Sequence, residues 1–245
     1  MTPRFQALSL ICLVVASLGC SRNQASLSPP KPAAFGAALV EASGGKQVTG
    51  VGAPLPQPVV VQVNDEQGNA LAGALVEFSG PVSVSFDPPH GLTDSSGQFS
   101  ASVALGAQAG RYQITATTTT KEQKKVELKL DEIALGYQET LGRQLDEQYC
   151  SRCHNPESTP ERVSNYDNLE AKPHPFPEGE TLNRLSEADL TAVISYGGPA
   201  LNRSALMPPY GYTLRKAEIQ ALIAYLRAVS DPPYRTSGMV YAKNQ

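Results

Sequence analysis

The period of the hydrophobic pattern changes near residue 130 of this 245-residue chain, and this change favours two domains over one. Before the change, apolar and polar side chains alternate in short runs, as in residues 59–63, 74–78 and 112–116. After it, apolar residues recur about every 3.6 positions. The first period predicts β-strands with one buried face and the second predicts amphipathic helices. The chain is therefore expected to be multidomain, with an all-β part followed by an all-α part.

Residues 37–130 are predicted to form a small β-sandwich. Turn signals separate the runs at regular spacing, namely DEQGN at residues 65–69 and DSSG at residues 94–97. The stretches GAPLPQPVVVQVNDEQGNALAGALVEF, TDSSGQF and AGRYQITAT together resemble a bacterial immunoglobulin-like (Ig-like) domain of the Big-1 type, found in invasin-like adhesins. The resemblance implies a spacer or docking module, and fold analogy alone gives no activity.

A charged segment, residues 121–132, is expected to end the β pattern, and residues 131–136 to link the two domains. The first helix is expected after it, because four apolar residues share one helical face: Ile133, Tyr137, Leu141 and Leu145.

Two further helices are predicted, with long proline-rich loops between them. Ser186 and Asp189 form a capping-box pattern for a helix over residues 187–196, which the following Gly-Gly-Pro ends. The last helix is expected over residues 215–229, before Asp-Pro-Pro. It lacks a Ser or Thr cap, since Arg215 stands there, and Thr213 is the candidate one turn earlier.

The sequence CSRCH at residues 150–154 carries the most specific chemistry of the chain. Two cysteines three positions apart, followed directly by histidine, place two sulfurs and an imidazole on one turn of chain. This arrangement suits two haem vinyl groups and the iron between them. Cys150 and Cys153 would form the thioethers, and His154 would take the proximal position on the iron.

Two other interpretations of this cysteine pair fit the sequence less well. A thioredoxin-like motif needs the pair at a helix N-terminus after a strand, whereas here it follows a predicted helix. A zinc site needs four ligands, but no second cysteine pair exists, and His90 and His174 lie in unrelated contexts.

The surrounding sequence resembles a class I c-type cytochrome over residues 137–230. GRQLDEQYCSRCH is similar to the entry helix of that family, and DLTAVISYGGPALNRSALMPPYGYTLRKAEIQALIAYLRAV to the remainder. The resemblance implies one covalent haem c with its iron. It also implies four residue roles: Met207 as distal ligand, Gly142 and Tyr225 at the crossing of the first and last helices, and Leu145 on the haem side.

One departure from the family concerns the backbone partner of His154. Asn155 and Pro156 follow it, where the family often has glycine and a later proline whose carbonyl orients the histidine. The partner could be Pro156, Pro160 or neither.

The N-terminus is typical of an export signal over residues 1–19, with Arg4 before a short apolar run. Ser-Leu-Gly-Cys before and at Cys20 resembles the lipobox of bacterial lipoproteins, which implies a lipid anchor on Cys20; ordinary signal-peptidase cleavage is the alternative. Residues 20–36 are polar and proline-rich and are expected to be an extended tether. Residues 231–245 are expected to be a C-terminal tail.

Composition limits the remaining functions. A net charge of -3 gives no basic footprint for nucleic acid, and no apolar stretch is long enough to span a membrane. With Cys12 in the signal and Cys20 as the candidate lipid anchor, the two remaining cysteines form no disulfide framework.

The expected function is single-electron transfer between redox proteins of the cell envelope, without catalysis at the haem. The expected location is the periplasm or cell surface, with an outer-membrane anchor favoured. Two alternatives remain. The first is a haem-based sensor of small ligands or an enzyme subunit, and the second is an adhesive or structural surface protein with an accessory haem.

Overall fold

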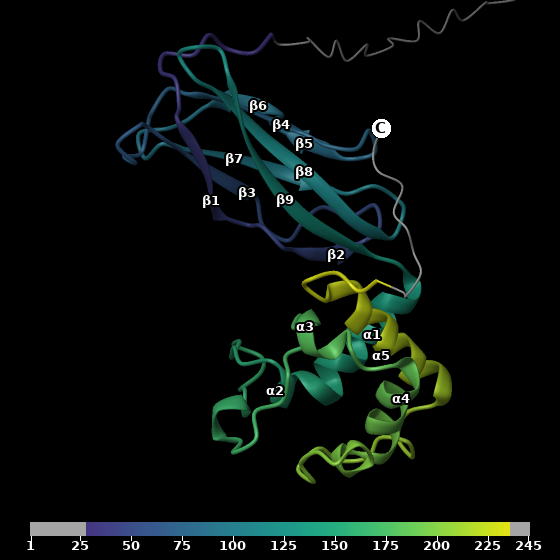
Figure 1. Ribbon diagram of the computed structural model, residues 1–245. Coiled ribbons are helices and arrows are strands. Elements are labelled where there is room, and N and C mark those ends of the chain that lie inside the picture. The colour runs from purple at the N-terminus through teal and green to yellow at the C-terminus, as the bar shows by residue number, and fades with distance from the viewer. Residues whose placement is uncertain (1–27, 236–245) are drawn as a thin grey trace, which may run out of the picture.

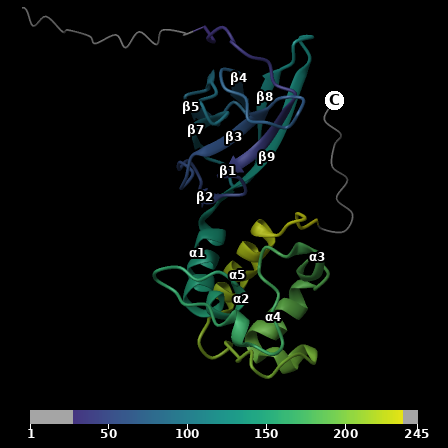
Figure 2. The ribbon, with the colours of Figure 1, turned by 90° about the vertical axis from the view of Figure 1, so that its left-hand side faces the viewer.

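The computed structural model describes residues 28–235. It contains an N-terminal β-sandwich followed by a separate helical domain (Figures 1 and 2). The predicted multidomain order, all-β then all-α, is confirmed.

The sandwich consists of two sheets. One has the strand order β1 (Ala38–Ser43), β3 (Val59–Asn64), β7 (Gln98–Ala104) and β5 (Ser85–Asp87). The other has the order β2 (Val48–Gly50), β9 (Lys125–Leu135), β8 (Gly110–Thr119), β4 (Leu75–Ser79) and β6 (His90–Leu92). Every named pairing is antiparallel except β2 with β9.

Alternation along the strands builds the core of the sandwich. In β3, the side chains of Val59, Val61 and Val63 are fully buried, while the residues between them are only partly buried. They pack with the inward residues of the other sheet, such as Val76 and Ile114. A strand with one buried face needs this period of two, which is why the sequence pattern identified the sandwich.

The prediction that the β pattern ends at residues 121–132 was wrong. β9 runs as Lys125–Leu135 and pairs with the whole length of β8. The charged residues of this strand alternate with Val126, Leu128 and Leu130, so the segment is an amphipathic strand rather than a polar linker. Ile133 belongs to this strand and not to the first helix.

The helical domain contains five α-helices. They are α1 (Tyr137–Leu145), α2 (Ser151–His154), α3 (Gly179–Leu182), α4 (Glu187–Tyr196) and α5 (Lys216–Val229). A π-helical turn, η1 (Asp146–Cys150), joins α1 to α2, and two short 3-10 turns are η2 (Tyr166–Asn168) and η3 (Gly198–Leu201). The predicted α4 and its capping box from Ser186 to Asp189 are confirmed.

The first and last helices cross at Gly142. A Cβ atom built there would lie 2.1 Å from the backbone oxygen of Ala221 and 2.6 Å from Cβ of Tyr225. Only glycine permits so close an approach, as the sequence suggested. Leu145 is buried in the helical core with Leu222.

The start of α5 is stabilised differently from the expectation. The carboxylate of Glu218 accepts hydrogen bonds from the backbone N–H of Arg215 (2.7 Å) and from its guanidinium (2.7 Å). Glu218 therefore supplies the N-terminal cap by reaching back, and the hydroxyl of Thr213 does not.

The two domains meet directly. A single residue, Gly136, separates β9 from α1. The Arg111 guanidinium on β8 donates to the backbone oxygen of Ser230, just beyond the C-terminus of α5. Lys46 forms an ion pair with Asp231 (2.8 Å) across the same junction.

Both ends of the described chain contact the fold. The N–H groups of Ala33 and Ala34 donate to the backbone oxygen of Gly73 (2.9 and 3.1 Å), so the end of the predicted tether lies on the sandwich. After α5, Tyr234 stacks under the guanidinium of Arg227 at 3.9 Å. Cys20 lies outside the described residues, and no helix within residues 28–235 is long and apolar enough to cross a membrane.

Candidate functional site

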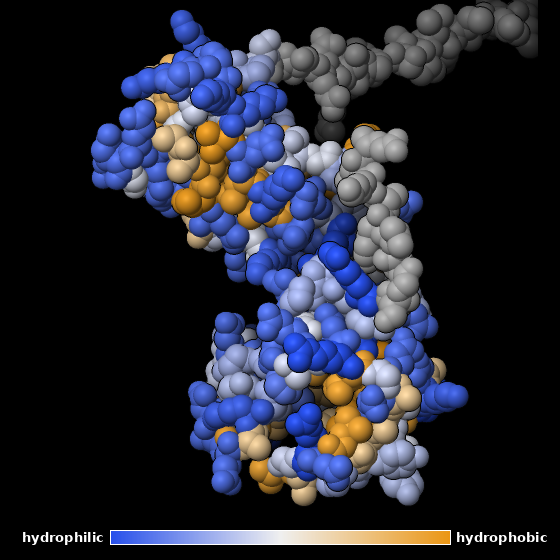
Figure 3. Space-filling model, viewed as in Figure 1, coloured by the Kyte–Doolittle hydropathy of each residue, from blue (hydrophilic) through white to orange (hydrophobic). Residues whose placement is uncertain are grey.

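A cavity of about 310 Å³ opens in the helical domain. Its walls bring together Cys150, Cys153, His154 and Met207, which are the four site residues predicted from the sequence. Apolar side chains gather around this hollow (Figure 3). The apolar part of the wall comes from α3, α4, α5 and the loops between them: Leu169, Phe176, Leu182, Leu185, Leu190, Val193, Ile194, Leu201, Leu222 and Leu226.

The cysteine pair lies on the chain just after α1. The π-helical turn η1 ends at Cys150, and Cys153 and His154 follow on the short helix α2. A π-turn inserts one extra residue into the helical path and is frequent at functional sites. Here it sets the direction in which the CSRCH segment leaves α1.

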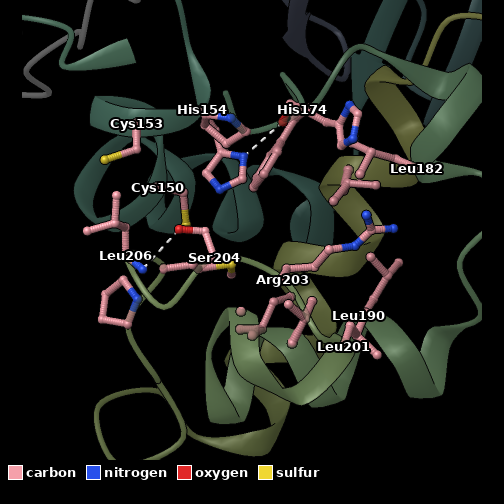
Figure 4. A pocket seen from close by; sticks show the side chains of 18 of the residues that line it. Cys150, Cys153, His154, His174, Leu182, Leu190, Leu201, Arg203, Ser204 and Leu206 are labelled. Carbon is pink, nitrogen blue, oxygen red and sulfur yellow. Dashed lines mark hydrogen bonds between the residues drawn. The ribbon is translucent and has the colours of Figure 1, made fainter. Parts of the chain in front are cut away.

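His154 is oriented by a backbone contact. Its Nδ1 lies 2.8 Å from the carbonyl oxygen of His174, to which an Nδ1–H donates (Figure 4). The other ring nitrogen, Nε2, faces into the cavity (Figure 4). Burial is the main cause that lowers the pKa of His154, which favours the neutral imidazole that binds metals. The backbone partner is neither Pro156 nor Pro160, since the contact comes from a residue 20 positions away.

Met207 is held by the turn that follows α4. The N–H of Gly198 donates to the Met207 carbonyl (3.1 Å), and a Cβ atom at Gly197 would lie 2.6 Å from that same oxygen. Gly197 also has φ of 82°, which favours glycine. The two glycines thus allow the Met-Pro loop to lie against α4.

A tyrosine pair ties this loop to the CSRCH segment. The hydroxyl of Tyr210 donates to the backbone oxygen of Tyr149 (2.8 Å), and the two rings pack edge to face with centroids 5.8 Å apart. The backbone N–H of Tyr210 donates to Ile194 at the end of α4 (2.9 Å). Tyr210 therefore fixes the distance between the two sides of the cavity.

The cysteines do not have the properties of a redox-active dithiol. Burial, followed by the nearby Asp146 and Cys153, raises the pKa of Cys150 to about 12. Reactive CxxC motifs instead lower the pKa of one thiol at a helix N-terminus. Both thiols are free in the structure.

A zinc site also finds no support. Within residues 28–235, no group of three or more His, Cys, Asp or Glu side chains is arranged to hold a metal ion. His90 lies on β6 in the sandwich, and His174 pairs with Glu178 (Nδ1 to Oε2, 2.8 Å).

The charges of the cavity wall have one sign. None of its lining residues is acidic, whereas the cationic side chains of Lys172 and Arg203 both line it. Asp146 lies one turn before Cys150, and its buried Oδ1 has no hydrogen-bond partner within residues 28–235. Burial, then repulsion from Glu147, raises its pKa to about 7.

These residues fit a covalently attached haem. The donor set combines two thiols at thioether spacing, an imidazole with Nε2 directed inward, and a thioether sulfur in the wall of an apolar cavity. A flat apolar macrocycle with anionic side groups matches apolar walls that carry cationic groups.

Several residues of the site were not found from the sequence. The His174 carbonyl is a backbone group in a loop, so no residue type signals it. In the sequence, Asp146 is an ordinary polar residue of a predicted helix, and nothing in the loop around Arg203 indicates that its side chain lines the cavity. For Tyr210, the sequence shows only that it lies three residues after Met207, in the Met-Pro-Pro-Tyr stretch; its hydrogen bond to Tyr149 could not be foreseen from this.

Comparison with known proteins agrees with this geometry for the helical domain. Residues 138–226 match the family model described as cytochrome C oxidase, cbb3-type, subunit III. No curated protein matches the chain.

Among solved structures, the β-sandwich is similar to the D00-D0 domain of Intimin, with 12% identity and a TM-score of 0.29. That match covers 39% of this chain and 45% of that one, so the chain spans less than half of its length. It is also similar to invasin, a bacterial integrin-binding protein, with 18% identity over 40% of this chain and 19% of that chain (TM-score 0.30). A conjugative transposon lipoprotein from Bacteroides eggerthii DSM 20697 has 10% identity over 39% and 94% of the two chains (TM-score 0.28).

Proposed function

We propose that this chain, in which residues 138–226 form a cytochrome c domain, carries single electrons through one haem bound to Cys150, Cys153 and His154. A cytochrome c domain implies covalent haem c, electron transfer and redox partners. The finer assignment to these residues is supported by one observation above all. The two thiols, the imidazole and the Met207 side chain line a single apolar cavity.

The proximal ligand is His154 and the distal ligand is Met207 in this proposal. The haem supplies a one-electron couple when bound, and a His/Met pair raises its potential. The His174 carbonyl fixes the tautomer and the ring plane of His154, since Nδ1 carries the proton and Nε2 is left as the donor to iron. Gly197 and Gly198 hold the Met207 backbone near the cavity.

Exclusion of water is the contribution of the remaining wall. Leu190, Ile194 and Leu222 are almost fully buried, and they line the cavity. Apolar surroundings would disfavour the oxidised iron, which carries one more positive charge than the reduced iron. They would therefore also raise the reduction potential. With His154 and Met207 both holding the iron, the haem would serve electron transfer rather than the binding of oxygen or peroxide.

The test is covalent attachment in protein matured with a haem-attachment system. Intact mass spectrometry should show one added haem that acid-acetone does not extract. Cys153→Ala should lose one thioether and shift the reduced α-band, and a Cys150→Ala, Cys153→Ala double variant should carry no covalent haem. Extractable haem in the unaltered chain would contradict the proposal.

The location proposed is the cell envelope, with lipid on Cys20 and the β-sandwich as a spacer or docking module. A lipid on Cys20, followed by the proline-rich segment, would hold the two folded domains near a membrane. Cys20→Ala should move the mature protein from the membrane fraction to the soluble fraction. Retention of that variant in the membrane would count against the anchor.

A further inference from the structure

The cavity wall contains one exposed arginine, Arg203, whose side chain has no partner among residues 28–235. Of the basic residues that line it, Lys172 donates to the backbone oxygens of Tyr166 (2.9 Å) and Asp167 (2.7 Å). His174 pairs with Glu178, and His154 with the His174 carbonyl. Within the described residues, the Arg203 side chain has neither a hydrogen bond nor an ion pair.

The backbone at Arg203 is held firmly, although the side chain is not. Its N–H donates to the Gly198 carbonyl (2.9 Å), and the preceding Asn202 adopts a left-handed conformation (φ 54°) that closes η3. A Cβ atom at Gly198 would lie 2.0 Å from the Ser204 oxygen, so this turn has no room to shift. The side chain therefore starts from a fixed point on the wall.

The direction of the side chain is informative. In Figure 4, Arg203 extends toward Leu182, on the side of the cavity away from Cys150 and Cys153. A haem c carries its two thioether links on one edge and its two propionates on the other. Attachment at the cysteines would therefore turn the carboxylates toward the side where the guanidinium lies.

From this placement we propose that Arg203 binds a haem propionate and thereby raises the reduction potential of the iron. The proposal rests on the covalent haem proposed above. An arginine can give a carboxylate two parallel hydrogen bonds, and such charge-assisted pairs are among the stronger polar contacts in proteins. No acidic side chain in the wall competes for the guanidinium.

The physical effect on potential follows from charge. A cation near the haem opposes the extra positive charge of the oxidised iron and also offsets the negative propionate. Removal of Arg203 should therefore favour the oxidised form. A unit charge about 10 Å away at an effective dielectric constant of about 20 shifts such an equilibrium by roughly tenfold.

The test compares three variants of the mature, haem-loaded full chain. Arg203→Gln should lower the midpoint potential by up to about 59 mV, which corresponds to a tenfold change in the equilibrium constant for electron exchange with a reference couple. It should also shift the propionate bending band in the resonance Raman spectrum. Arg203→Lys should restore most of the potential, but not the band position, because lysine keeps the charge and loses the planar fork.

Arg184→Gln is the matched control. Arg184 is exposed, has no side-chain partner among the described residues and does not line the cavity. It should leave the Raman band unchanged. The inference is overturned if the haem is covalently attached and Arg203→Gln changes the potential and the propionate band no more than Arg184→Gln. Absence of covalent haem from all proteins, the unaltered chain included, would instead refute the proposed function and with it the inference.

Discussion

The imidazole of His154 and the backbone of His174 meet at 2.8 Å, so two histidines approach the same cavity in different roles. The first offers a ring nitrogen to the interior, and the second offers its carbonyl while its own ring pairs with Glu178. His174 is the other histidine that lines the cavity, and it is therefore the alternative to Met207 as distal ligand.

We predict that Met207→Ala changes the iron and that His174→Ala does not. Loss of the thioether should lower the reduction potential by on the order of 0.1 V, within the range that axial ligands control. It should also abolish the weak near-infrared sulfur-to-iron band of the oxidised protein and allow carbon monoxide to bind the reduced form.

His174→Ala keeps the backbone carbonyl and should preserve the near-infrared band. If the unaltered protein has no such band and His174→Ala alone shifts the spectrum, the haem is ligated by two histidines and Met207 is not a ligand.

Gly142→Ala should destabilise the helical domain. The added Cβ would lie 2.1 Å from the Ala221 oxygen, so α1 and α5 must separate. Overpacking of this kind costs about 1–3 kcal/mol in the free energy of unfolding, and here a backbone atom is the obstacle. Gly50→Ala is the control, since nothing lies within 4 Å of a Cβ at that position. Equal denaturation midpoints for both variants would show that the crossing is not tight.

Glu132→Gln should remove part of the pH dependence of stability. The Glu132 side chain is fully buried in the sandwich, and burial is the main cause that raises its pKa to about 7. Its Oε2 accepts from the Gln47 N–H (2.6 Å), which lowers the pKa, while the charges of Glu41 and Asp131 raise it.

The sign follows from the raised pKa. Folded protein holds the proton up to about pH 7, but the unfolded chain loses it near its ordinary value of 4.5. The free energy of unfolding therefore falls between these two pH values, by at most about 3 kcal/mol. Glu132→Gln should match the unaltered protein near pH 4.5 and exceed it at pH 8.

Asp146 titrates over the same range, because its pKa is also raised to about 7. Asp146→Asn should therefore be measured in parallel, and its effect subtracted. Parallel stability curves for Glu132→Gln and the unaltered protein from pH 4.5 to 8 would refute the prediction for Glu132.

Association with a redox partner should depend little on ionic strength. From Tyr137 onward the chain has only Lys172, Lys216 and Lys243, and its acidic residues outnumber its basic ones. Long-range attraction by a lysine-rich face is therefore absent from this segment. Stopped-flow electron transfer measured from low to high salt provides the check. A steep fall in rate with salt would contradict this, unless the partner is strongly basic.

The sequence predicted the elements whose periodicity is strong. The alternating valines of β3 and the Ser186–Asp189 capping box of α4 are local patterns, and both appear in the structure as expected. The prediction for strand β9 was wrong, because charged side chains occupy every second position from Lys125 to Asp131. They form the exposed face of the strand, and the segment therefore resembled a polar linker in the sequence.

The parts of the site that the sequence did not reveal depend on contacts between distant segments. The contact to His154 is made by the backbone carbonyl of His174, which no residue type can signal. Arg203 stands out only because the other basic side chains of the wall already have partners in the structure. Such relationships arise from the tertiary fold, which one-dimensional spacing does not encode.

A single residue separates the last strand from the first helix, and Arg111 and Lys46 bond across the same junction. These contacts tie the helical domain, and the cavity within it, to the edge of the sandwich. A redox partner can approach the cavity only from the range of directions that the placement of the sandwich leaves open. On the proposed role of the sandwich as a docking module, lengthening or turning it should change which molecules exchange electrons with this protein, without altering any residue around the cavity.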